Sequence, residues 1–162
     1  MVDWTLVGSS LLSVGIAYAL ALPVGWDREQ EERSAGLRTF PLVAMGSCGY
    51  ILLAQEVLSV SAEAQARVVE GLITGIGFIG GGAILKTSAS VKGTATAASI
   101  WSTGAIGGAV AYERYEIAIV LSLINFATLR WLGRFKPTAN VPGTPDGMTE
   151  PEPVGETREG QR

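Results

Sequence analysis

Long stretches without a charged side chain constrain this chain more than any other feature. The first covers residues 4–26, which lie between Asp3 and Asp27. A helix of that length is about 34 Å long, enough to cross a hydrocarbon core of ~30 Å. Trp4 and Trp26 stand at its two ends, where aromatic side chains favour the membrane interface. The run therefore predicts a transmembrane helix. A cleaved signal peptide is the alternative, but Asp3 occupies the region where such a peptide carries positive charge.

Four further apolar runs follow the same pattern. Residues 39–55, 71–85 and 93–112 carry no charge, and residues 117–129 form the last run. The third is short, but its helix can begin near Ala66 if Arg67 extends its charged end toward the interface. We therefore predict an all-α polytopic membrane protein with a transmembrane domain over residues 1–136 and five spans, at residues 4–26, 39–56, 66–86, 93–112 and 115–134.

The charge distribution supports a membrane protein over a soluble one. Residues 1–136 carry only ten acidic and ten basic side chains, too few to cover the surface of a soluble globule. The remaining residues, 137–162, hold five of the seven prolines and five acidic side chains, with almost nothing apolar to bury. We expect this segment to be a disordered cytoplasmic tail.

The basic residues predict the orientation. If the loop at residues 27–38 is cytoplasmic, eight basic residues of the first 136 face the cytoplasm and only Arg67 and Arg114 face the other side. An excess of Lys and Arg marks the cytoplasmic side of a membrane protein. We expect the N-terminus outside, the C-terminus in the cytoplasm, and the lipid bilayer as the main partner.

The composition limits the kinds of functional site that the chain can form. The chain has no histidine and a single cysteine, Cys48. The commonest general base and transition-metal ligand is therefore missing, and no disulfide can form within the chain. We predict that the protein is not an enzyme, holds no cofactor or structural metal, and binds no nucleic acid.

Glycine is abundant, at 21 of 162 residues. Small residues let membrane helices approach closely, and six glycines stand in patterns that suit this role: Gly75, Gly77, Gly80, Gly82, Gly104 and Gly107. The alternative is that residues 77–82 form an opened helix at a ligand site, as in transporters with broken spans.

Polar residues near the ends of the spans are the candidate functional residues. We predict a cluster of Asp27, Arg28, Arg38 and Thr39 at the inner face, with Asp27 and Arg38 as its ion pair. Glu70 is a second candidate, as an acid within the membrane, although a salt-bridge cluster with Glu63 and Arg67 at the outer interface is the simpler explanation. Asp27 and Glu70 lie at opposite ends of their spans, separated by about 24 Å along a helix. They cannot share one Mg²⁺ ion, whose ligands lie at ~2.1 Å.

Three segments carry a resemblance to a known family. These are residues 35–39 (AGLRT), 75–82 (GIGFIGGG) and 91–98 (VKGTATAA). In this order the chain resembles the MgtC/SapB family of bacterial inner-membrane proteins over about residues 25–112. Asp27-Arg28 matches the Glu-Arg pair that often follows the first span of the family, whereas Glu70 has no counterpart in its motifs.

The resemblance implies a five-span inner-membrane protein linked to growth at low magnesium and, in pathogens, to survival inside host cells. It also implies regulation of a membrane partner such as ATP synthase. A further expected partner is a second copy of the chain, in a homo-oligomer. The alternative function is a small transporter or channel for Mg²⁺ or another ion, with the glycine-rich part of the third span as its path.

Overall fold

The computed structural model describes residues 3–30, 35–58, 61–86 and 91–132. These ranges form five α-helices, a π-helical turn and a small hairpin: α1 (Trp4–Gln30), α2 (Thr39–Val57), α3 (Ala62–Gly82), β1 (Leu85–Lys86), β2 (Val91–Lys92), α4 (Thr94–Ala111), α5 (Tyr115–Ala127) and the π-helical turn Thr128–Leu132. The predicted tail at residues 137–162 lies outside the described residues.

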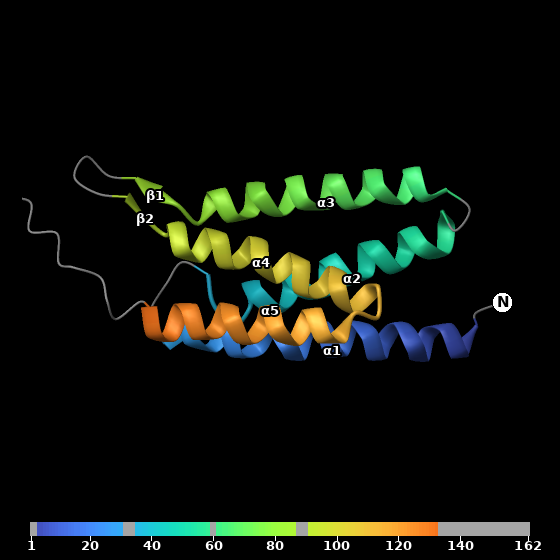
Figure 1. The fold of residues 1–162 in the computed structure, drawn as a ribbon, viewed down its shortest axis with the longest axis horizontal. Coiled ribbons are helices and arrows are strands. Elements are labelled where there is room, and N and C mark those ends of the chain that lie inside the picture. The colour runs from blue at the N-terminus through green and yellow to red at the C-terminus, as the bar shows by residue number, and fades with distance from the viewer. Residues whose placement is uncertain (1–2, 31–34, 59–60, 87–90, 133–162) are drawn as a thin grey trace, which may run out of the picture.

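The helices run up and down in a bundle (Figure 1). α4 is the central helix and contacts each of the other four, whereas α3 lies at one edge, against α4 and α2. The end of α1, the start of α2, the hairpin and the end of α5 come together at one end of the bundle (Figure 1). Segments from the first, middle and last parts of the chain therefore lie at this end.

The all-helical prediction is confirmed, and each expected span contains one helix. Three helical segments are long and apolar enough to cross a membrane, namely Trp4–Gln30, Thr39–Val57 and Tyr115–Leu132. α3 and α4 do not reach that level, because α3 carries three charged residues and many glycines and α4 is rich in Ser, Thr, Gly and Ala. Five membrane spans therefore remain a prediction.

The third span differs from its predicted bounds of residues 66–86. α3 begins four residues earlier, where the Ser61 hydroxyl accepts a hydrogen bond from the Ala64 N–H (3.1 Å) and caps the helix. It ends at Gly82, and Leu85 and Lys86 pair with Lys92 and Val91 in an antiparallel hairpin. The turn into α4 needs glycine at position 93, since φ is +90° there and a Cβ would overlap the Ala83 carbonyl oxygen.

Small side chains let α4 occupy the centre of the bundle. A Cβ at Gly107 would lie 2.1 Å from the Ala44 carbonyl oxygen, and one at Gly80 would lie 3.0 Å from the Ala97 carbonyl oxygen. α4 thus packs its backbone directly on α2 and α3. Such close contact replaces the hydrophobic effect as the force that joins helices in lipid.

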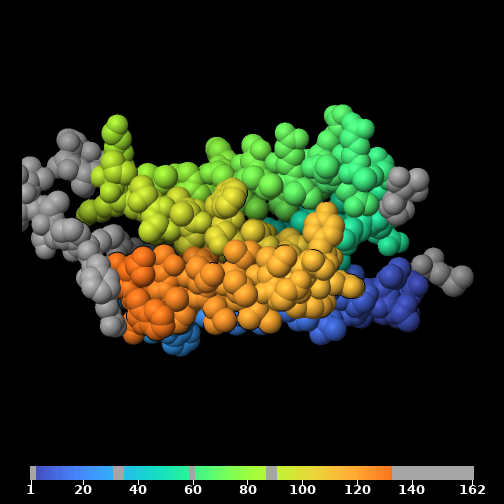
Figure 2. Space-filling view, in the orientation of Figure 1, coloured from blue at the N-terminus to red at the C-terminus, as the bar shows by residue number. Residues whose placement is uncertain are grey.

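Large apolar side chains cover the outside of the bundle. Phe78 is 84% exposed, Trp4 77% and Leu11 72%. Figure 2 shows one long face on which α3, α4 and α5 lie side by side. An apolar exterior around a core of small residues is the arrangement expected of helices dissolved in lipid.

Candidate functional site

A buried ion pair lies at the end of the bundle where α1 finishes. Asp27 is 2% exposed and Arg28 is 4% exposed, and an Arg28 Nη2 donates to Asp27 Oδ2 at 2.7 Å. The second oxygen of Asp27 lies 3.9 Å from Nη1 of Arg130, which is half exposed. Asp27 is therefore the anion between two guanidinium groups, one from its own helix and one from the π-helical turn that follows α5.

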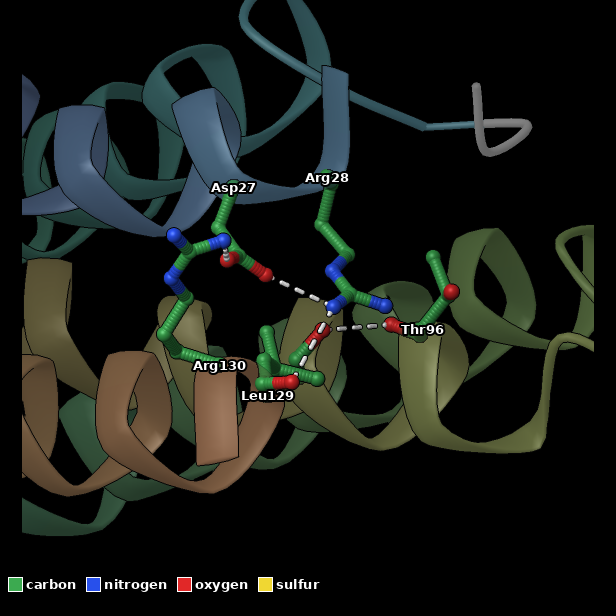
Figure 3. A network of polar contacts seen from close by, with 6 residues as sticks. Asp27, Arg28, Thr96, Leu129 and Arg130 are labelled. Atoms are coloured by element: carbon green, nitrogen blue, oxygen red, sulfur yellow. Dashed lines mark hydrogen bonds and ion pairs between the residues drawn. The ribbon is translucent and has the colours of Figure 1, made fainter. Parts of the chain in front are cut away.

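Arg28 also connects α1 to the π-helical turn that follows α5. Arg28 Nη2 also approaches the Leu129 carbonyl oxygen, at 3.5 Å. Leu129 belongs to the π-helical turn Thr128–Leu132, and the last carbonyl groups of a helix lack partners within it and carry partial negative charge. Figure 3 shows these residues and Thr96 of α4 in one network, here called the polar cluster (Asp27, Arg28, Thr96, Leu129 and Arg130).

A line of polar side chains continues from the polar cluster into the bundle. Ser99 donates to the Thr96 carbonyl oxygen (2.9 Å), and Thr103 donates to the Ser99 carbonyl oxygen (2.8 Å). Asn125 Nδ2 of α5 donates to the same Ser99 oxygen at 3.2 Å. These groups satisfy one another where no water is at hand, so they hold α5 against α4.

A further bond joins α5 to α1. The Ser122 hydroxyl donates to the Leu20 carbonyl oxygen at 2.7 Å. With Asn125 and the polar cluster, it places three polar connections along α5. Sequence reasoning missed Ser122 and Asn125 as functional candidates, although an amide within an apolar run is a recognisable signal because its burial in lipid is costly without a partner.

The predicted four-residue cluster is divided by the structure. Asp27 and Arg28 form the buried pair, but the expected Asp27–Arg38 pair was wrong, because Asp27 is held by Arg28 and Arg130. Arg38 is exposed and, with Thr39, lines a separate groove between α2 and α3. The reason is the path of residues 35–38, which directly precede α2.

Glycine sets that path. A Cβ at Gly36 would overlap the Glu29 carboxylate, and a Cβ at Gly25 would lie 3.2 Å from the Leu37 Cα. Glu29 Oε2 in turn accepts a hydrogen bond from the Leu37 N–H at 3.1 Å. Gly36 and Leu37 thus pack closely against the end of α1, just before Arg38.

The candidate glycines fall into two groups. Gly80, Gly104 and Gly107 each lie against a neighbouring helix, whereas a Cβ at Gly75, Gly77 or Gly82 would meet nothing within 4 Å among the described residues. The alternative of an opened helix at residues 77–82 was wrong, since α3 is helical throughout this stretch. The path that a broken span would provide is therefore not formed there.

Glu70 lies on the exposed surface of α3, and its carbonyl oxygen accepts a hydrogen bond from the Thr74 hydroxyl at 2.9 Å. Its neighbours Glu63 and Arg67 form a separate exposed ion pair at 2.9 Å. In the described part of the chain, no group of three or more Asp, Glu or Cys side chains is placed to hold a metal ion. The one buried carboxylate of the site, Asp27, already faces two cations.

Comparison with known proteins identifies the family. Residues 14–137 match the model of the MgtC family. Protein MgtC of Salmonella typhimurium is 32% identical over 114 residues, which cover 70% of this chain and 48% of that protein. "Putative magnesium transporter YhiD" of Escherichia coli K12 is 35% identical over 112 residues, covering 65% of this chain and 52% of YhiD.

Protein SrpB of Synechococcus elongatus is 32% identical over 146 residues, covering 83% of this chain and 79% of SrpB. The chain thus spans about half the length of MgtC and YhiD. No solved structure matches it. The match over three quarters of its length shows that the chain belongs to the MgtC family, and its apolar helices mark it as an inner-membrane protein of that family.

Proposed function

We propose that this protein helps the bacterium adapt to low magnesium by regulating a membrane partner such as ATP synthase. In a pathogenic bacterium the same regulation would contribute to virulence. The role is non-enzymatic. The names of two relatives support the link to magnesium, since one is Protein MgtC and the other is named for magnesium transport.

The proposal includes five membrane spans with the N-terminus outside. The distribution of charge supports this orientation. Among the described residues, the bundle end at which α1 finishes carries five cations and two anions, whereas the opposite end carries two cations and six anions. A cationic cytoplasmic face follows the rule that Lys and Arg stay inside.

The net positive charge of the polar cluster favours a regulatory role over Mg²⁺ transport. Mg²⁺ is bound through carboxylates and keeps much of its water. Asp27 is buried between Arg28 and Arg130, so an approaching Mg²⁺ would meet a net positive site and a carboxylate that is already hydrogen-bonded. Such a cluster is suited to fixing the end of α1 against the turn that follows α5, and hence the shape of the cytoplasmic face that a partner contacts.

The first experiment separates regulation from transport. The protein is reconstituted into proteoliposomes that contain a Mg²⁺ indicator, and the same protein is expressed in a bacterium that lacks its own MgtC-family gene. We expect no Mg²⁺ flux above that of protein-free vesicles, together with restored growth at low Mg²⁺ and reduced proton-driven ATP synthesis in inverted membrane vesicles. Saturable Mg²⁺ flux that Gly77→Leu abolishes would instead favour the transporter.

The second experiment tests the polar cluster. Asp27→Asn removes the anion between two cations, and breaking a buried pair in this way costs about 3–5 kcal/mol. We expect loss of growth at low Mg²⁺, with partial recovery in the double variant Asp27→Asn/Arg28→Gln, which also removes one of the cations. Glu63→Gln is the matched control, because Glu63 pairs with an arginine on the exposed surface. Unchanged growth of the Asp27→Asn strain would contradict the role of the cluster.

A further inference from the structure

We propose that the groove between α2 and α3 binds one acyl chain of an anionic phospholipid, whose phosphate group lies on Arg38. The groove has a volume of about 360 Å³. Leu42 and Tyr50 of α2 and Leu72 and Ile76 of α3 are among the apolar side chains that line it, and Arg38 and Thr39 lie at its polar end. A cation at the mouth of an apolar groove matches the two parts of a phospholipid.

Arg38 is available to an anion. It is exposed, and none of the ion pairs among the described residues involves it. The described acid nearest along the loop, Glu29, accepts a hydrogen bond from the Leu37 N–H instead. The planar guanidinium group can bind a phosphate through two parallel hydrogen bonds, and the hydroxyl of Thr39 adds a donor.

The start of α2 does not itself provide the anion site. The N–H groups of Thr39 and Phe40 both donate to the Gly36 carbonyl oxygen, at 3.0 and 3.2 Å, and Pro41 has no N–H group. The side chains of Arg38 and Thr39 therefore supply the donors. The inference rests on this cation and the groove beside it, not on the helix end.

The length of the groove fits an acyl chain. Arg38 and Tyr50 are twelve residues apart, about 18 Å along a helix, while one leaflet contributes about 15 Å of hydrocarbon. A second cavity of about 550 Å³ continues along α3 and shares Tyr50, Leu72 and Ile76 with the first.

The surrounding charge favours an anionic lipid over a neutral one. The hairpin, which carries Lys86 and Lys92, lies at the same end of the bundle as the start of α2, which Arg38 precedes (Figure 1). If this end faces the cytoplasm, it meets a leaflet whose anionic lipids attract Lys and Arg side chains. The inference takes from the proposed function only the orientation of this end toward the cytoplasm. It would survive if the regulatory function failed.

Lipid binding to the purified full chain in detergent micelles tests the headgroup. Native mass spectrometry would compare phosphatidylglycerol with phosphatidylcholine of identical acyl chains. We expect wild type to bind phosphatidylglycerol about tenfold more tightly, a difference of ~1.4 kcal/mol. Arg38→Gln should remove this preference and Arg38→Lys should keep part of it. Lys92→Gln, which removes a cation from the same end of the bundle, should retain most of it.

Two glycines of α2 test the acyl-chain part. A Cβ at either Gly46 or Gly49 would meet nothing within 4 Å, so both positions accept a larger side chain. Gly46 lines the proposed groove, whereas Gly49 lines a different one between α1 and α2. We expect Gly46→Leu to bind both lipids about tenfold more weakly than wild type, because the leucine side chain fills the groove. Gly49→Leu should bind both lipids as wild type does.

Several results would overturn the proposal. Equal binding of the two lipids by wild type would do so without any variant, and so would an Arg38→Gln protein that keeps the preference. Wild-type lipid binding by Gly46→Leu would exclude the groove as the acyl-chain site. Competition by glycerol phosphate at the same concentration as the lipid would assign Arg38 to a soluble phosphate compound instead. None of these results depends on the growth or flux assays of the proposed function.

Discussion

Replacing Gly107 by alanine tests directly how the bundle is held together. The added methyl carbon would lie 2.1 Å from the Ala44 carbonyl oxygen and 3.0 Å from Ser47 Cβ, whereas ordinary contact begins at 3.4 Å. α4 must therefore move away from α2 by about 1.3 Å to accept it. Such overpacking costs about 1–3 kcal/mol, and a shift of backbone against backbone places this substitution in the upper part of that range.

Helix propensity acts in the opposite direction, since alanine is favoured over glycine by about 1 kcal/mol in a helix. Gly77→Ala gives the same gain without the clash, because nothing lies within 4 Å of its Cβ. We therefore expect Gly107→Ala to be about 2–3 kcal/mol less stable than Gly77→Ala, the steric cost alone. Reversible unfolding in mixed micelles would measure the difference. Equal stability of the two variants would refute the close contact between α2 and α4.

Three smaller changes follow from the same packing. Gly36→Ala should displace the Glu29 carboxylate and free the loop before α2, at a cost of about 1–2 kcal/mol, measured by unfolding and by faster proteolysis of that loop; unchanged proteolysis would contradict it. Ser122→Ala removes the bond to the Leu20 carbonyl oxygen and should cost only about 0.6 kcal/mol, so a loss above 2 kcal/mol would show that the bond does more than join two helices. Gly93→Ala should cost more than Ser122→Ala in the same assay, because the new Cβ would meet a carbonyl oxygen in a left-handed backbone, and equal stability to wild type would contradict that geometry.

The starts of the helices were predictable because they depend on local signals. α1, α2 and α5 begin at Trp4, Thr39 and Tyr115, where the predicted spans begin, since a charged residue precedes each apolar run. The third span was harder to bound. Glycine carries no charge, so the uncharged run predicted a span as far as residue 86. Glycine also weakens a helix, however, and α3 ends at Gly82.

The candidate site was predictable only in part. Asp27 and Arg28 stand out because they are charged residues at the end of an apolar run. Arg130, the second cation that faces Asp27, lies 103 residues further along the chain than Asp27, and no local pattern connects them. Asn125 carried a readable signal as an amide in an apolar run, but its acceptor on Ser99 depends on how α5 is rotated against α4.

The sequence by itself determined the number of helices, their approximate ends and the charge of each end of the bundle. All of these follow from the order of charged and apolar residues along the chain. Charged residues partition into water and apolar residues into lipid, wherever the helices lie relative to one another. Only the tertiary structure decided which glycines touch a neighbour, and that Asp27 faces Arg130 while Arg38 opens onto a groove. Those contacts depend on the rotation of each helix about its axis and on the turn at Gly36, and neither is encoded in the apolar run that makes the helix.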